Sequence, residues 1–224
     1  MILNISQRKT IKHWATGLFA WFVALTLFFP ILWMIMTSFK TELQAIAQPP
    51  LILWEATLDN YALIQERSDY VKYALNSFYT SIGGTLLALI IAIPCAYAMA
   101  FDPSRGTKDI LMWMLSTKML PAAAVLYPMI FLTKSIGLFD THFLVIMVLS
   151  LINLPIVIWM LFTYFKDIPK DIIEAGKMDC VNTWGEIRDI LIPLAWCGIT
   201  STALLTFIFC WNEAYWTVRL TTIE

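Results

Sequence analysis

Charged residues are scarce in this chain: they make up 14% of its 224 residues, whereas 59% are hydrophobic. Soluble domains contain about a quarter charged residues, so this composition is typical of a membrane protein. The formal net charge is only −1, and basic residues form no stripe along the sequence. Both observations argue against a nucleic-acid-binding protein.

Motifs for catalysis and for metal binding are also missing. The four cysteines lack CxxC or other metal-ligand spacing, and the two histidines have no companion ligands. Gly176-Lys177 is followed by Met178, and no earlier glycine has the spacing of a phosphate-binding loop. We therefore expect no enzymatic activity, no metal site and no bound cofactor in this chain.

Five apolar segments are long enough to cross a bilayer as helices, which takes about 20 residues each. These segments are residues 14–36, 73–100, 110–132, 142–164 and 193–216. Only helices and closed barrels satisfy their backbone hydrogen bonds in lipid, and the alternating pattern of barrel strands is absent. The sequence therefore predicts an all-α, polytopic membrane protein.

Lysine and arginine are unevenly distributed between the two sides of such a bundle. The N-terminal tail and the second and fourth connections contain nine of them, and the opposite side contains five. The positive-inside rule then places the N-terminus in the cytoplasm. The resulting topology has a cytoplasmic tail (1–13), an external connection (37–72), a cytoplasmic connection (165–192) and an external end (217–224). The external connection is either an ordered segment that meets a soluble partner or a simple solvated one.

The cytoplasmic connection carries its own helix signals. Pro169 suits a first helical turn, where a missing N–H costs nothing. Thr183 and Glu186 have the spacing of a capping box. An apolar helical face follows, formed by Trp184, Ile187 and Leu191. The pattern predicts a helix–turn–helix outside the membrane that packs against a partner protein.

One stretch of this connection resembles a known motif. Residues 174–180 read EAGKMDC and are followed by Ile190-Leu191-Ile192-Pro193, which resembles the EAA loop of ABC-importer permeases. The family pattern is E-A-A-x-x-D-G with I-x-L-P further along. The matching residues are Glu174, Ala175, Asp179 and Pro193. Gly176 replaces the second alanine conservatively, and Cys180 replaces the glycine.

The resemblance extends over nearly the whole chain. The carbohydrate-importer, MalG-like branch is indicated by Ser38-Phe39-Lys40-Thr41-Glu42, Thr57-Leu58-Asp59-Asn60-Tyr61, Asn76-Ser77 and Trp211-Asn212-Glu213. Within this branch, sorbitol and mannitol permeases look closest at residues 115–119, 153–161 and 210–214. The resemblance implies the helical-bundle fold of a type I importer permease. Such permeases usually have six spans, so we expect five spans here and a chain that stops before the sixth.

The resemblance also implies a function and a set of partners. The chain is expected to be the permease of an ATP-driven importer for polyols or a related carbohydrate, in the bacterial inner membrane. Expected partners are a second permease, two copies of an ATPase that binds ATP and magnesium, and an external solute-binding protein. The loop is expected to dock on the ATPase, with Glu174 in an ion pair and Asp179 in the turn. Another sugar or glycerol phosphate stays open as the substrate. An ion-coupled secondary transporter would need buried acidic residues that these spans lack.

Four further residues are candidates for a functional role. Glycine at position 180 would permit a positive φ in the turn, and Cys180 can reach that conformation only at a cost of about 1 kcal/mol. This substitution is either tolerated with slightly weaker coupling or the mark of a decayed or mis-sequenced gene. Lys118 lies inside an apolar segment, so it lines a cavity or snorkels to the interface. Asn153 contacts a hydroxyl-rich substrate or bonds two helices together, and Glu213 forms a gate or flanks an aromatic belt.

Overall fold

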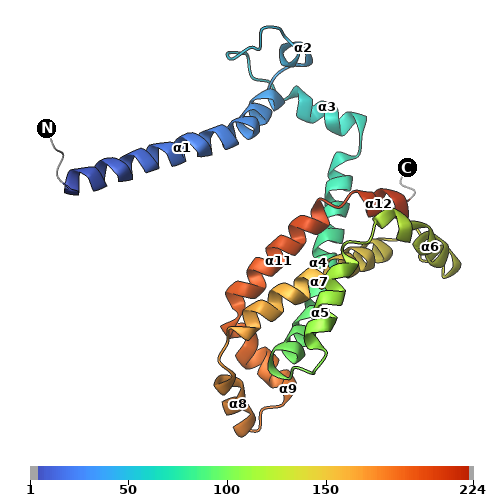
Figure 1. The fold of residues 1–224 in the computed structure, drawn as a ribbon. Coiled ribbons are helices and arrows are strands. Elements are labelled where there is room, and N and C mark those ends of the chain that lie inside the picture. The colour runs from blue at the N-terminus through green and yellow to red at the C-terminus, as the bar shows by residue number, and fades with distance from the viewer. Residues whose placement is uncertain (1–4, 222–224) are drawn as a thin grey trace. The chain divides into compact units, whose positions relative to one another are not determined.

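The computed structural model describes residues 5–221, and all regular secondary structure within them is helical (Figure 1). The predicted all-α fold is therefore confirmed. The helices are α1 (Ile5–Ser38), α2 (Glu42–Ala45), α3 (Asp59–Arg67), α4 (Tyr70–Phe101), α5 (Thr107–Thr117), α6 (Ala122–Ser135), α7 (His142–Lys166), α8 (Lys170–Met178), α9 (Thr183–Gly185), the π-helix η1 (Glu186–Leu191), α10 (Ile192–Leu194), α11 (Trp196–Trp211) and α12 (Tyr215–Leu220). The chain divides into two compact units, with the boundary between Lys72 and Tyr73.

Three continuous helices are long and apolar enough to cross a membrane: residues 12–38 of α1, then α4 and α7. They correspond to the predicted spans 14–36, 73–100 and 142–164. Two further spans are present if each of two bent helix pairs counts as one, which gives up to five. The ends of the predicted tail (1–13) and of the predicted external segment (217–224) lie outside the described residues.

The predicted span 110–132 is not one helix, which is a correction. It consists of α5 and α6, which are bent by 89° relative to each other. Pro121 immediately precedes α6. Proline has no backbone N–H and disfavours the helical conformation of the residue before it, so the first helix ends ahead of it.

The predicted span 193–216 is also broken. Residues 183–194 and α11 are bent by 84°, and Ala195 stands between them. Pro193 removes one backbone donor just before this bend. At the other end, α11 stops at Trp211 and α12 begins only at Tyr215. The segment therefore has one bend near its beginning and a break near its end.

In the first unit, the connection after α1 is organised around the buried side chain of Lys40, which is 2% exposed. Its ammonium nitrogen donates a hydrogen bond to the carbonyl oxygen of Leu51 at 2.7 Å. It also lies 4.6 Å from the ring centroids of both Trp33 and Trp54. Cation–π attraction and the hydrogen bond together replace the hydration that a buried ammonium loses.

Backbone contacts close the same connection. The Asn60 amide donates to the carbonyl oxygens of Ser38 and Lys40, at 3.0 and 2.6 Å. The Thr57 N–H donates to the Phe39 carbonyl oxygen at 2.9 Å. These bonds tie the beginning of α3 to the end of α1, so the connection has a defined structure. Contact with a soluble partner stays a prediction.

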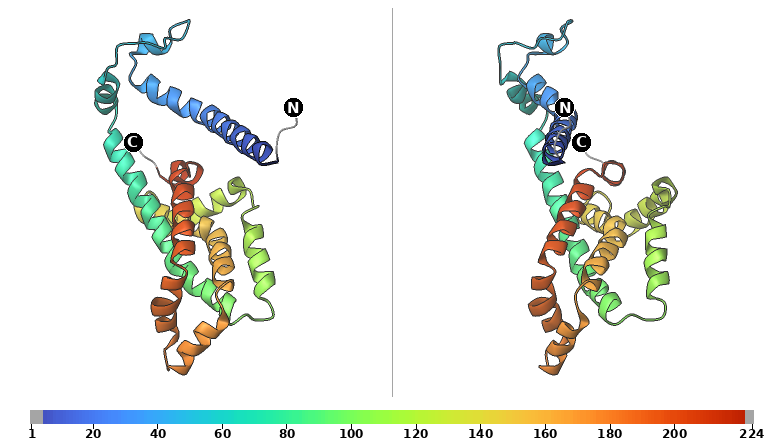
Figure 2. Two further views of the ribbon diagram at one scale, coloured as in Figure 1. Left: turned by 90° about the vertical axis from the view of Figure 1, so that its left-hand side faces the viewer. Right: turned by 60° about the vertical axis from the view of Figure 1, so that its left-hand side comes forward.

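The second unit is built on close packing of α4, α7 and α11. Its main apolar cluster combines alanines of α4 with larger side chains of α7 and α11, among them Ala88, Ala92, Ala96, Val157, Leu161 and Ile199. Small residues let the helix backbones approach closely. Gly198 of α11 is one such point, since a Cβ there would lie 2.6 Å from the Tyr164 ring of α7. In Figures 1 and 2, α8 and α9 lie together at one end of this unit, and α12 lies at the other.

Replacement of Lys40 by methionine should loosen the connection between α1 and α3. Methionine keeps most of the buried volume but loses the hydrogen bond and both cation–π contacts, of which each is worth about 0.5–2 kcal/mol. We expect faster cleavage of residues 41–58 by proteinase K in Lys40→Met than in the unsubstituted protein. The control is Lys72→Met, because Lys72 is exposed. Equal cleavage rates for the two variants would contradict the role of Lys40.

Candidate functional site

The predicted helix–turn–helix is present as a hairpin that we define as α8, α9 and η1 with the turn between them, residues 170–191. Pro169 is the residue immediately before α8, one position earlier than predicted. The inner face of the hairpin is apolar, and its buried residues include Ile173, Ile187 and Leu191, which are 2%, 4% and 0% exposed. The hairpin therefore packs by one face onto the rest of the second unit.

The turn after α8 has the hydrogen bonds of a Schellman motif. The Val181 N–H donates to the Gly176 carbonyl oxygen, and the Cys180 N–H donates to that of Lys177, both at 3.1 Å. Cys180 has a φ of 58°, in the left-handed region that glycine usually occupies in this motif. The predicted positive φ is thus confirmed. Asp179 lies at the C-cap of α8.

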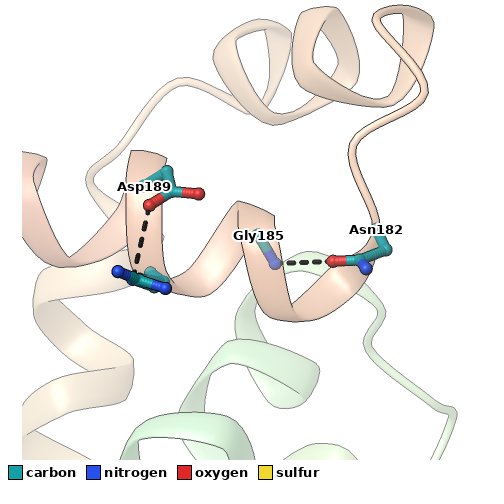
Figure 3. A network of polar contacts seen from close by, with 4 residues as sticks. Asn182, Gly185 and Asp189 are labelled. Carbon is teal, nitrogen blue, oxygen red and sulfur yellow. Dashed lines mark hydrogen bonds and ion pairs between the residues drawn. The ribbon is translucent and has the colours of Figure 1, made fainter.

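The second half of the hairpin differs from its prediction. The N-cap is Asn182, not Thr183: the Asn182 side-chain oxygen accepts a hydrogen bond from the Gly185 N–H at 2.8 Å (Figure 3). Glu186 does not complete a capping box, because its carboxylate is buried and accepts a hydrogen bond from the Tyr97 hydroxyl. Arg188 and Asp189 form an exposed pair at 3.7 Å (Figure 3), which contributes little to stability.

Trp184 was predicted to share one apolar face with Ile187 and Leu191, and that face was expected to pack against a partner protein. Trp184 is instead 68% exposed, whereas Ile187 and Leu191 are buried within the chain. The helical phase changes here, because the three-residue helix α9 passes directly into η1, which has the wider turn of a π-helix. The side chains of Ile187 and Leu191 therefore face the interior of the second unit, whereas the side chain of Trp184 does not.

The outer face of the hairpin brings together most of the motif residues. Glu174, Ala175, Asp179 and Cys180 are all exposed there. Two large apolar side chains accompany them, Met178 at 84% and Trp184 at 68% exposure. Gly176 faces inward instead, and a Cβ there would lie 2.6 Å from Ile190 Cδ1. Exposed tryptophan and methionine are enriched at protein-binding surfaces.

The three residues predicted for the substrate path lie in one region of the second unit. Lys118 is at the C-cap of α5, in the bend before α6, and its ammonium donates to the Asn153 side-chain oxygen at 3.1 Å. Asn153 is 2% exposed, and its amide also donates to the Leu149 carbonyl oxygen and the Cys210 sulfur. Asn153 therefore joins α7 to both α5 and α11.

Glu213 has a structural role at the break between α11 and α12. One of its carboxylate oxygens accepts hydrogen bonds from the backbone N–H groups of Tyr215 and Trp216, at 3.1 and 3.3 Å. It thereby caps the first turn of α12. Glu213 also interacts electrostatically with Lys118. Within residues 5–221, no group of three or more His, Cys, Asp or Glu side chains is placed to hold a metal ion.

A bundle of apolar helices with a helical hairpin at one end is the architecture of an ABC-importer permease. Residues 84–223 match the family model of the binding-protein-dependent transport system inner membrane component. The chain belongs to this family, and it is therefore a membrane-embedded permease subunit.

Individual relatives agree with this assignment. A probable ABC transporter permease of Sinorhizobium fredii, y4oR, is 28% identical over 99% of this chain and 80% of its own length. The trehalose transport permease SugB of Mycobacterium tuberculosis is 30% identical over 86% of this chain and 70% of its own length. In the crystal structure of a bacterial ABC transporter that imports alginate, one chain matches all of this chain with a TM-score of 0.79. The match covers 78% of that chain at 21% identity, so it shows the fold.

The substrate names of similar permeases bear on one prediction. They include trehalose, diacetylchitobiose and sulfoquinovosyl glycerol. These names do not support sorbitol or mannitol as the substrate, whereas the membership of the sugar-importer branch is confirmed.

Cys180→Gly should relieve the turn after α8. A left-handed conformation costs a non-glycine residue about 1–2 kcal/mol, and glycine avoids this cost. We expect a higher thermal midpoint of unfolding and unchanged or faster substrate uptake. The matched control is Cys197→Gly, which places glycine in a regular helix, α11, and should lower stability by up to about 1 kcal/mol. A substantial loss of uptake in Cys180→Gly would refute the strain at this turn.

Proposed function

We propose that this chain is the transmembrane permease of an ATP-driven importer for a carbohydrate, and that its hairpin is the contact to the ATPase subunit. The hairpin itself carries the proposal: its inner face is packed into the second unit, and its outer face exposes Glu174, Met178 and Trp184. A helical element fixed on one side and exposed on the other suits a lever that a partner can push.

The mechanism follows from this arrangement. Closure of an ATPase dimer displaces the hairpin, and the apolar contacts of Ile187 and Leu191 pass that displacement to the spanning helices. Alternating access then results from rotation of the helices about the substrate path. Glu174 forms an ion pair with the ATPase, and Asp179 holds the turn beside it.

The proposed assembly contains four kinds of protein. This chain pairs with a second permease in the bacterial inner membrane, two ATPase copies bind the cytoplasmic face, and a solute-binding protein delivers the substrate outside. The excess of basic residues on the tail and on the second and fourth connections supports a cytoplasmic N-terminus.

The substrate is a carbohydrate with several hydroxyl groups. Residues 115–119 and 210–214 resemble polyol permeases, whereas the relatives' names favour disaccharides such as trehalose. A polar path through the membrane suits either class. We place Lys118 and Asn153 on that path: one Lys118 N–H donates to Asn153, which leaves two donors for substrate hydroxyls. Glu213 lies beside them and forms the end of the path.

Uptake measurements on the reconstituted complex test the proposed function. Radiolabelled sorbitol, mannitol, trehalose and diacetylchitobiose serve as probes in proteoliposomes loaded with ATP and supplied with the binding protein. We expect uptake of one of them that persists in the presence of an uncoupler and stops when the ATPase is omitted. Glu174→Ala should reduce uptake about tenfold or more, since an interfacial charge contact is lost. Glu66→Ala, at an exposed glutamate of α3, is the control.

Uptake that stops with the uncoupler and continues without the ATPase would instead identify an ion-coupled transporter.

The substrate path has a separate test. Lys118→Met removes the ammonium donors but retains an unbranched chain of similar length. We expect the substrate concentration for half-maximal uptake to rise about tenfold, because a hydrogen bond to a charged donor is worth roughly 1.5–3 kcal/mol. Lys108→Met, near the beginning of α5, is the control. An unchanged concentration dependence would remove Lys118 from the path.

A further inference from the structure

The Glu186 carboxylate is the least expected polar group in the second unit. Glu186 is 2% exposed, and its hydrogen-bond donor is the hydroxyl of Tyr97, which is 7% exposed. Tyr97 lies near the end of α4, and Glu186 is the first residue of η1. Among the described residues, this is the one side-chain hydrogen bond that joins the hairpin to a spanning helix.

The surroundings of this pair are apolar. Tyr97 and Ile187, the neighbour of Glu186, belong to the cluster that includes Leu111 of α5, Phe165 of α7 and Leu191 of η1. The Tyr97 ring also packs on Phe101, with 5.3 Å between the ring centroids. A carboxylate is costly to bury in such a place unless a partner compensates it.

Stability alone gives no reason for this polar pair. Apolar side chains of similar volume at both positions would fill the same cluster without the desolvation cost, and such replacements are often neutral or stabilising in other proteins. What a hydrogen bond adds is direction: it holds one atom of η1 against one atom of α4. Apolar packing by itself allows two surfaces to slide past each other, whereas a buried hydrogen bond is lost when they slide.

The pair of Tyr97 and Glu186 lies between the hairpin and a spanning helix, where a displacement of the hairpin would be transmitted. Glu186 begins a π-helical segment, and such widened turns occur frequently at functional sites. The bend at Ala195 follows η1, so a displacement of the hairpin is not carried in a straight line into α11. The hydrogen bond between Tyr97 and Glu186 adds a directed connection from the hairpin to α4, beside the apolar packing of Ile187 and Leu191.

We infer that Tyr97 and Glu186 are a positioning pair through which displacement of the hairpin is transmitted to α4. The inference rests on the proposed function, because it assigns a role within the ATP-driven cycle. Neither residue contacts substrate or ATP. When the pair is intact, α4 follows the hairpin; when it is broken, the ATPase completes its cycle while α4 lags behind.

The quantity that tests this role is the number of carbohydrate molecules imported per ATP hydrolysed by the full complex in proteoliposomes. The probe is the sugar from the uptake experiment above that the unsubstituted complex accumulates. Tyr97→Phe should lower this ratio about tenfold while ATP hydrolysis stays within about twofold, because the hairpin still binds the ATPase. Tyr79→Phe, which removes an exposed hydroxyl from the same helix, should leave the ratio unchanged.

Two further variants separate positioning from a purely structural role. Glu186→Gln retains a side-chain oxygen that accepts from Tyr97, so it should keep most of the import per ATP. The double variant Tyr97→Phe with Glu186→Leu makes the contact wholly apolar. It should assemble and unfold thermally like the unsubstituted protein, yet its import per ATP should stay as low as in Tyr97→Phe.

These measurements distinguish a positioning role of the pair from a role in folding alone. If the double variant recovers import per ATP together with stability, or if Tyr97→Phe keeps the original ratio, the positioning role is overturned. If import and hydrolysis fall in proportion to the amount of assembled complex, the pair serves folding alone and the inference is also wrong. If the unsubstituted complex imports no probe with ATP, the proposed function fails first, and that result is distinct from the other two.

Discussion

The packing of the hairpin into the same apolar cluster as the spanning helices is the interaction on which the rest of this structure depends. Ile187 and Leu191 of η1 are buried together with side chains of α4, α7 and α11. The hairpin is therefore a continuation of the bundle core and not an appended domain. Because close-packed interiors transmit displacement with little compression, a force on the exposed face has a direct route to the membrane helices.

Prolines inside the long helices of this chain have a different effect from prolines at its bends. Pro94 and Pro155 lie inside α4 and α7, which stay continuous. Pro121 and Pro193 lie at the two sharp bends. Neighbouring helices can compensate the missing hydrogen bond in the middle of a packed helix, but a proline near a helix end leaves the chain free to turn. Lys118, whose ammonium donates to the Asn153 side-chain oxygen, lies at the bend before α6.

The sequence predicted the features that depend on local pattern. Hydrophobic runs located α4 and α7 closely, and the departure from the motif at Cys180 predicted the left-handed turn that the structure shows there. Hydropathy did not reveal the bends, because a bent pair of apolar helices has the same composition as a straight one. Local spacing also assigned Glu186 to a cap, since its partner Tyr97 is 89 residues away in the chain. A pairing of that kind leaves no mark in either local sequence.

The contacts of Lys40 with Trp33 and Trp54 bear on how the first unit responds to pH and to salt. Among the described residues its contacts are two indole rings and a carbonyl oxygen, and none of these gains a proton in mildly acidic water. A connection held by carboxylates would lose those contacts at low pH, where the carboxylates gain protons. One held by exposed ion pairs would weaken at high salt concentration. This connection can therefore keep its shape both in mildly acidic water and at high salt concentration.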